Sequence, residues 1–224
     1  MVPILVILTI AAFLLVELAL VWRKRKAEAT EKAVAAAAGL NAVPLFRMPE
    51  GLFYHPGHTW AHLTPAGDAL VGLDDFAQGV IGTIDRIELP EPGARIRQGE
   101  TAFTVIQNRK RIDFVSPVSG TVDSVNDNVN AEIVRLKEDP YGSGWLYAIR
   151  PGDIAHDLRR MRIARDAAAW LEREIARFTD FVTVHMAVPQ EVGVTMRDGG
   201  VFVNGIVEGI DGELLHLLVR KFFR

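Results

Sequence analysis

The first hydrophobic block of the chain has the length of a membrane-spanning helix. The residues from Val2 to Trp22 are apolar except for Thr9 and Glu17. A helix of about 21 residues at ~1.5 Å per residue crosses a hydrocarbon core of ~30 Å. The basic run Arg23–Lys26 follows directly, and basic residues behind a span keep that side in the cytoplasm. We therefore expect residues 2–22 to form a single-pass helix of the inner (cytoplasmic) membrane, with the N-terminus outside and the C-terminal body cytoplasmic.

A basic flank and a helical stalk are expected next, over residues 23–48. Residues 27–38 are mostly Ala, Glu and Lys, which are good helix formers. Gly39 follows this run, and glycine is a common helix end.

The pattern changes between Phe53 and Ile149, where short apolar or alternating runs are separated by turn residues. Thr59–Leu63 and Ala69–Leu73, for example, flank the turn Thr64–Asp68. Many short strands with frequent Gly and Pro turns are typical of a β-sandwich or barrel. We therefore expect a mainly β module at residues 49–151.

One hairpin of this module has a basic tip. Ala102–Ile106 and Ile112–Val115 read as its two strands. The tip between them is Gln107, Asn108, Arg109, Lys110 and Arg111.

Six motifs of this module occur in the order and at the spacing of one known family. They are Tyr54 with His58-Thr59-Trp60, Val71-Gly72-Leu73-Asp74-Asp75-Phe76-Ala77-Gln78, Ile84–Pro90, Gly99-Glu100, Ser116-Pro117-Val118-Ser119-Gly120 and Asp139-Pro140-Tyr141-Gly142-Ser143-Gly144-Trp145-Leu146. From Phe53 to Pro151 the chain resembles the H protein of the glycine cleavage system, of the lipoyl/biotinyl-carrier superfamily. The resemblance implies a flattened barrel-sandwich hybrid in which a lysine at a hairpin tip bears lipoate. In that family, the lipoyl arm carries an aminomethyl group between partner enzymes.

The attachment lysine is where the chain departs from this family. Counted without gaps from Gly99 and back from Ser116, the modified lysine of the family falls on Arg109. Arginine cannot be lipoylated, because its guanidinium stays protonated and is a poor acyl acceptor. Lys110 is the neighbouring attachment candidate, but a shift of one residue turns a strand side chain to the other face. The basic tip is otherwise a solvated turn or a contact for an acidic partner.

Residues 152–224 are expected to form a helix and a small α+β extension. Asp153 is expected to cap one long helix whose apolar positions, from Ile154 to Phe178, are spaced by three or four. Extended segments at 181–188 and 192–196 and a hairpin turn at 197–200 should follow. Asp211 is expected to cap a last helix, residues 212–223. The expected fold class is thus mainly β, a barrel-sandwich hybrid of lipoyl-carrier type with an N-terminal transmembrane helix and a small α+β extension.

Composition excludes several kinds of chemistry. The chain has no cysteine and a formal net charge of −3, which removes thiolate sites and gives no global attraction to nucleic acid. His55, His58 and His62 lie in a strand-like segment without a completing carboxylate, so we expect no metal site. Asp74 and Asp75 read as a helix cap with a solvated neighbour rather than an acid–base pair. We expect no catalytic residues and no enzyme activity.

Two functions remain open for such a chain. The first is a membrane-anchored, H-protein-like module that is not lipoylated and serves as an adaptor or scaffold. The second is a lipoyl carrier modified at Lys110 that moves an aminomethyl or other lipoate-bound group between enzymes. Lipoate is the one cofactor implied. The expected partners are proteins, either glycine cleavage enzymes or other lipoate-handling enzymes, together with the membrane at the N-terminal helix.

Overall fold

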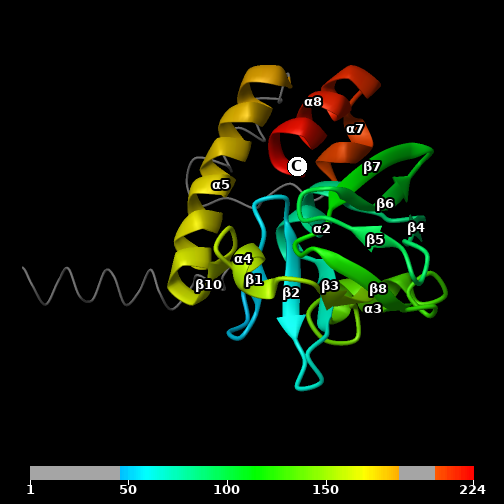
Figure 1. Cartoon of the computed structure of the whole chain (residues 1–224). Helices are drawn as coiled ribbons and strands as arrows, with labels where there is room; N and C mark the ends of the chain where they lie inside the picture. Colours follow the sequence, from blue (N-terminus) through cyan, green and yellow to red (C-terminus); the bar gives the residue numbers. More distant parts are fainter. Residues whose placement is uncertain (1–45, 187–204) are drawn as a thin grey trace, which may run out of the picture. The chain divides into compact units, whose positions relative to one another are not determined.

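Two antiparallel β-sheets form the centre of this computed structural model, which describes residues 46–186 and 205–224 (Figure 1). Across the larger sheet the strands are β10 (Arg162–Ile163), β1 (Phe53–Tyr54), β2 (Thr59–Leu63), β3 (Ala69–Leu73), β9 (Tyr147–Pro151), β8 (Gly120–Val125) and β5 (Arg95–Ile96). The smaller sheet contains β4 (Arg86–Glu88), β6 (Thr101–Gln107) and β7 (Lys110–Val115). The mainly β, barrel-sandwich part of the expected fold is confirmed.

Six helices accompany the sheets in the described part of the chain. They are α2 (Asp75–Ile81), α3 (Ile133–Glu138), α4 (Ile154–Leu158), α5 (Ala164–His185), α7 (Ile206–Gly209) and α8 (Gly212–Phe222). Two of the expected caps are confirmed: the carboxylate of Asp74 accepts from the amide of Ala77 at the start of α2, and that of Asp211 accepts from Leu214 at the start of α8.

The core of the larger sheet is built around one indole ring. Trp60 of β2 is fully buried and lies opposite Gly72 of β3. A Cβ atom at Gly72 would lie only 2.3 Å from the Trp60 ring. The glycine of the Val71-Gly72-Leu73 motif therefore provides the space that the tryptophan occupies.

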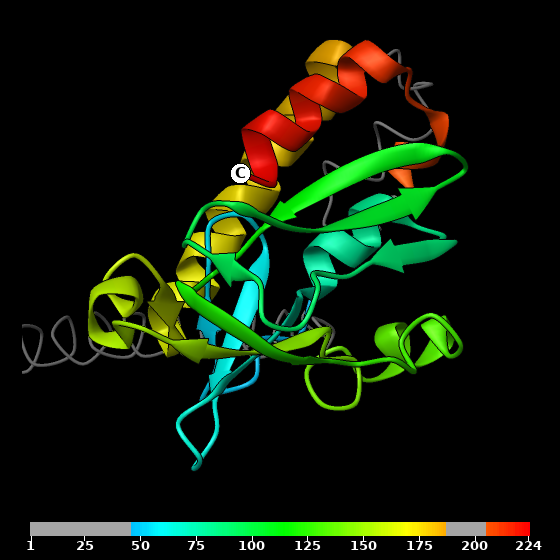
Figure 2. The ribbon, with the colours of Figure 1, turned by 45° about the vertical axis from the view of Figure 1, so that its right-hand side comes forward.

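The C-terminal helices share this core rather than forming a separate one. Phe222 of α8 packs against Phe178 and Phe181 of α5, with ring centroids 5.4 and 5.5 Å apart. The next residue, Phe223, packs against Phe114 of β7 at 4.7 Å. Figure 2 shows α5 and α8 side by side next to the β6–β7 hairpin. The end of α8 thus joins α5 to the smaller sheet.

The prediction of one long helix starting at Asp153 is wrong, because the structure has two helices separated by a short strand. Asp153 does cap a helix, but α4 ends at Leu158, and the chain then forms β10, which pairs with β1. Helix α5 starts only at Ala164, a residue in the left-handed region (φ 49°). It runs to His185, through part of the segment expected to be extended. The expectations for 192–196 and 197–203 lie outside the described residues.

The fold class needs one further correction, because it included a transmembrane helix. Within residues 46–186 and 205–224, no helix is both long and apolar enough to cross a bilayer. The longest, α5, carries charged residues along its exposed face, among them Arg165, Glu172 and Arg173, and charged residues in a bilayer core are costly. The expected span at 2–22 and the stalk at 23–48 up to residue 45 lie outside the described residues. The inner-membrane location stays a prediction.

Candidate functional site

The hairpin tip, expected at residues 107–111, is shorter in the structure: it is a two-residue turn, because β6 extends to Gln107 and β7 begins at Lys110. Gln107, the last residue of β6, pairs with Lys110, the first residue of β7. Asn108 and Arg109 lie between them, both in the left-handed region, with φ angles of 45° and 66°. Two residues with positive φ between paired strands are the signature of a type I′ turn, which favours Asn in the first position. Arg109 is therefore the second of the two residues at the end of the hairpin, and its side chain is exposed.

The neighbours of the turn hold it in place. Gln107 is buried and donates from Nε2 to the carbonyl of Ile81 at 2.6 Å. The amide of Asn108 donates to the carboxylate of Asp85 at 2.6 Å, and the amide of Asp85 donates back to Ile106 O at 2.9 Å. The backbone of the tip is thus fixed against the segment that joins α2 to β4.

Arg111, on β7, forms an ion pair with Glu88 of β4. Its guanidinium lies 2.7 Å from Glu88, which also pairs with Arg86 at 2.7 Å. The hydrogen bond from Arg111 lowers the pKa of the Glu88 carboxyl. These exposed pairs contribute little stability, but they align β4 beside the hairpin.

Lys110 does not point freely into solvent. It is half-buried, and its Nζ donates to Val207 O at 2.6 Å and to Glu208 O at 3.0 Å. Both carbonyls belong to α7, whose last carbonyls have no partner within so short a helix. The ammonium group thus provides donors for the carbonyls at the end of α7.

Helix α7 is itself fastened to the module. Glu208 Oε1 accepts from the amide of Thr83 at 2.9 Å, and the amide of Gly205 donates to Gly79 O at 2.9 Å. A Cβ at Gly82 would lie 2.4 Å from Gly205 Cα, so the two backbones touch. No sequence pattern predicts this helix, because four residues are too few to show a hydrophobic period.

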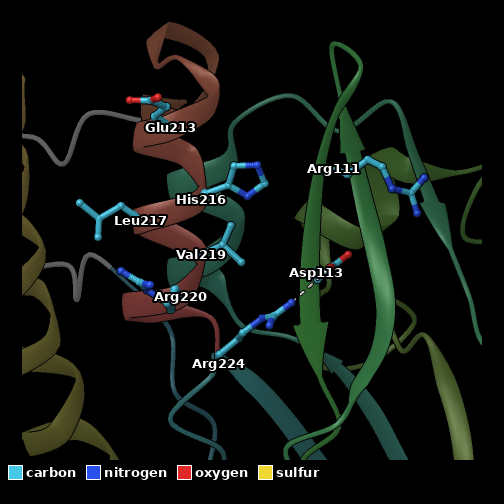
Figure 3. A pocket seen from close by; sticks show the side chains of 8 residues that line it. All are labelled: Arg111, Asp113, Glu213, His216, Leu217, Val219, Arg220 and Arg224. Atoms are coloured by element: carbon cyan, nitrogen blue, oxygen red, sulfur yellow. Dashed lines mark hydrogen bonds and ion pairs between the residues drawn. The ribbon is translucent and has the colours of Figure 1, made fainter.

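A cleft of about 650 Å³ lies between α8 and β7, next to the same hairpin (Figure 3). It is lined by Arg111, Asp113, Glu213, His216, Leu217, Val219, Arg220 and Arg224. Arg224 crosses the lower end of the cleft to Asp113, at 3.4 Å. Acidic and basic side chains are mixed here, so the cleft has no single charge to select a ligand.

The histidines have structural environments. His58 is fully buried and stacks on Phe76 at 4.3 Å. Its Nδ1 lies 2.8 Å from Asp74, and its Nε2 lies 3.9 Å from Glu174 of α5. Burial alone lowers the pKa of His58, but the two carboxylates outweigh it and raise the pKa to about 9.

His55 shows the opposite shift. Burial lowers its pKa to about 4, helped by the nearby positive charges of His58 and Arg160. Its Nδ1 accepts from the amide of Gly57 at 3.0 Å. Asp75, the second member of the acidic pair, binds Arg47 at 3.0 Å. Within the described residues, no cluster of three metal-ligating side chains is present.

Comparison with known proteins gives one consistent family. The model of the glycine cleavage H-protein family matches residues 52–174, which run from just before β1 into α5. A probable glycine cleavage system H protein of Pyrococcus abyssi is 34% identical over 127 residues, which are 57% of this chain and 94% of the relative. The glycine cleavage system H protein of Hydrogenovibrio crunogenus is 38% identical over 108 residues, 48% of this chain and 84% of that protein.

A solved structure agrees with these relatives. The crystal structure of a glycine cleavage system H protein from Mycobacterium marinum superposes with a TM-score of 0.50 at 26% identity. It covers 56% of this chain and 99% of that chain. The family match therefore includes the whole hairpin, while residues 175–224, with α7 and α8, lie beyond it.

Proposed function

Because the chain belongs to the glycine cleavage H-protein family, we propose that it is a member whose hairpin is not lipoylated and which serves as an adaptor between protein partners. Proteins of this family carry lipoate, are carriers rather than catalysts, and work with glycine cleavage enzymes. The carrier-shaped body is present here. This barrel-sandwich module would bind partners without carrying a lipoyl group.

Arg109 is the observation that carries the proposal. It occupies the second position of the type I′ turn, where the gapless count places the lysine of the family. Lipoylation joins an amine nitrogen to the carboxyl carbon of activated lipoate as an amide. A guanidinium has its lone pairs delocalised and stays protonated, so it does not act as that nucleophile. The turn therefore does not fit lipoate at its usual position.

Lys110 fits the group no better. An attaching enzyme needs the lysine amine deprotonated and exposed, whereas this Nζ donates to two α7 carbonyls at 2.6 and 3.0 Å. Loading it would require Nζ to give up both bonds, which would leave the two carbonyls at the end of α7 without this donor. This geometry supports the unloaded form.

As an adaptor, the hairpin would act through Arg109 itself. The turn is pinned by Asp85 and Gln107, so the guanidinium is presented with little loss of backbone freedom on binding. An arginine fork matches a carboxylate in a bidentate pair. An acidic pocket on a partner, such as a glycine cleavage enzyme, is the complementary surface.

Intact-mass analysis of the full-length chain from its native host, grown with lipoate, tests the proposal. We expect no lipoyl adduct on the natural protein. In a parallel assay with lipoate, ATP and a lipoyl-protein ligase, Arg109→Lys should gain one adduct, because the turn geometry is already in place. The double variant Arg109→Lys with Lys110→Ala is the matched control and should be modified equally.

The alternative function is a carrier loaded at Lys110, and the same measurement separates the two. A lipoyl adduct on the natural protein that disappears in Lys110→Ala would establish the alternative and refute the adaptor. The specific observation in its favour is that Lys110 is the only lysine at the tip.

A further inference from the structure

The two outer strands of the larger sheet approach each other through α4. β5 and β10 lie at opposite ends of the strand order. Gln98, just after β5, nevertheless donates from Nε2 to the carbonyl of Asp157 in α4 at 2.8 Å. The amide of Ser119 donates to the carboxylate of Asp157 at 2.6 Å. Helix α4 therefore bridges the segment around β5 to the chain entering β10.

Arginines line both sides of this junction. Arg95 and Arg97 lie in and just after β5, and Arg159 and Arg160 directly follow α4. We call these four residues the arginine seam. All four are exposed, and Arg95 and Arg97 border a hollow of about 560 Å³ together with Glu100 and Ser119. Along the chain, Arg162 and Arg165 continue the basic run.

The four guanidinium groups of the arginine seam outnumber the two carboxylates of the junction, Glu100 and Asp157. Arginines elsewhere pair with carboxylates, for example Arg111 with Glu88 and Arg150 with Asp123, whereas no seam arginine forms an ion pair within the described part of the chain. The two carboxylates accept hydrogen bonds from neutral donors, Asp157 from Ser119 and Glu100 from the amide of Arg97 at 3.0 Å, so they keep their charges and leave a positive excess at the seam. Clustered like charges repel one another, and a polyanionic ligand would relieve that repulsion.

We propose that the arginine seam binds an acidic segment of a partner protein and so forms a second contact surface of the adaptor. This inference rests on the proposed function, because it assigns the adaptor a second place at which it contacts a partner. The seam contains arginines only, whose planar forks match carboxylates. The net charge of −3 gives no general attraction to nucleic acid, and the seam is too small to follow a phosphate backbone.

A labelled decaglutamate peptide is a suitable probe, with binding to the full-length chain followed by fluorescence anisotropy at low and physiological salt. We expect saturable binding that weakens as salt rises. Arg159→Gln with Arg160→Gln should weaken it at least tenfold, and Arg95→Gln with Arg97→Gln should do the same. Arg173→Gln with Arg220→Gln removes two exposed arginines outside the seam and is the matched control, expected to bind as the natural protein does.

The outcomes that overturn the inference are equally definite. Equal weakening in the control pair would mean that binding follows total charge and not the seam. Tighter, equally seam-dependent binding of a single-stranded oligonucleotide or of anionic vesicles would assign the surface to a different class of ligand. NMR shifts induced by the peptide should occur at residues 95–97 and 159–160; shifts at the hairpin instead would refute the location.

The failure of this inference can be told apart from failure of the proposed function. The peptide assay does not depend on the modification state of the hairpin, whereas intact mass does not depend on the seam. A lipoylated protein that still binds the peptide through the seam would refute the unloaded adaptor and leave the binding surface in place.

Discussion

The buried imidazole of His58 is positively charged at neutral pH. The neighbouring carboxylates determine how much free energy the burial of this charge costs. Asp74 lies within hydrogen-bond distance, while Glu174 of α5 lies 3.9 Å from Nε2 and also pairs with Arg177 at 2.7 Å. A buried ion pair stabilises only when its partners are complete, and removing one partner leaves an uncompensated charge. Glu174 thus links the stability of the module to the docking of α5.

Glu174→Gln isolates this electrostatic link because the side chain keeps its size. We expect the pKa of His58, now about 9, to fall and the protein to lose roughly 1–3 kcal/mol of stability. An NMR titration of the imidazole and urea unfolding measure the two effects. Glu172→Gln, an exposed neighbour on the same helix, is the control. A His58 pKa that stays unchanged would show that Glu174 is electrostatically irrelevant.

A second prediction for a single residue concerns steric overlap at Gly72. In Gly72→Ala the new methyl group would lie 2.3 Å from the ring of Trp60, which is fully buried and has little room to move. Overpacking of this kind costs about 1–3 kcal/mol. Thermal unfolding should therefore shift clearly downward. Gly152→Ala adds the same methyl group where no atom lies within 4 Å, and it should leave the unfolding temperature nearly unchanged.

At the scale of elements, α7 depends on the lysine beside the hairpin turn. Lys110→Met keeps the apolar stem but leaves the carbonyls of Val207 and Glu208 without the ammonium donor. We expect a loss of about 1–3 kcal/mol and faster hydrogen exchange at the amides of Gly205 and Glu208, which donate to Gly79 and Gly205.

Lys137→Met provides the control for that prediction. Lys137 is close enough to contribute to lowering the pKa of Glu208, but no hydrogen bond from its side chain is present in the described structure. Its loss removes a nearby charge without removing a donor. If both variants accelerate exchange in α7 equally, the charge of Lys110 matters rather than its hydrogen bonds.

The elements that could be predicted are those whose local signals agree with their packing. The β6–β7 hairpin combines apolar strands with a turn-forming tip, and the gapless count along the sequence places Arg109 within that tip, where it forms the turn with Asn108. The helix caps Asp74 and Asp211 could also be predicted from the sequence. In these cases the sequence pattern and the tertiary contacts favour the same local conformation.

The elements that the sequence pattern did not predict are decided by distant contacts. Met161 fits a helical period, yet β10 forms just after it because Arg162 and Ile163 pair with β1. Val182 and Thr183 favour an extended chain, but α5 continues because Phe181 and Val182 are buried and Phe181 packs on Phe222. The hydrogen bond from Lys110 to Val207 O joins residues that are 97 positions apart. A local sequence pattern cannot predict such a contact.

Across the whole molecule, the described residues beyond the family match, 175–186 and 205–224, pack onto the family module. Phe223 packs on Phe114 of the hairpin strand and lies 5.9 Å from the ring of His58. The added helices thus contact both the attachment hairpin and the buried histidine. We therefore expect the added helices and the β module to unfold together in one cooperative transition.

The two buried histidines predict how stability depends on pH. His55 has a folded pKa of about 4 against 6.5 unfolded, so its contribution is complete above pH 6.5 and declines as the pH falls toward 4. His58 has a folded pKa of about 9, so its contribution is complete below pH 6.5 and declines as the pH rises through 9. Together they place a stability maximum near pH 6.5.

The size of this effect can be measured by urea unfolding between pH 5 and pH 8.5, a range that avoids most carboxyl titration. From the maximum we expect a loss of about 1 kcal/mol at pH 5 and about 2 kcal/mol at pH 8.5. His55→Asn keeps an acceptor for the amide of Gly57 and should flatten only the acid side. Glu174→Gln should move only the alkaline side, toward lower pH. A profile that rises steadily to pH 8.5 would mean that His58 is neutral in the folded protein, and the charged link between the module and α5 would then be absent.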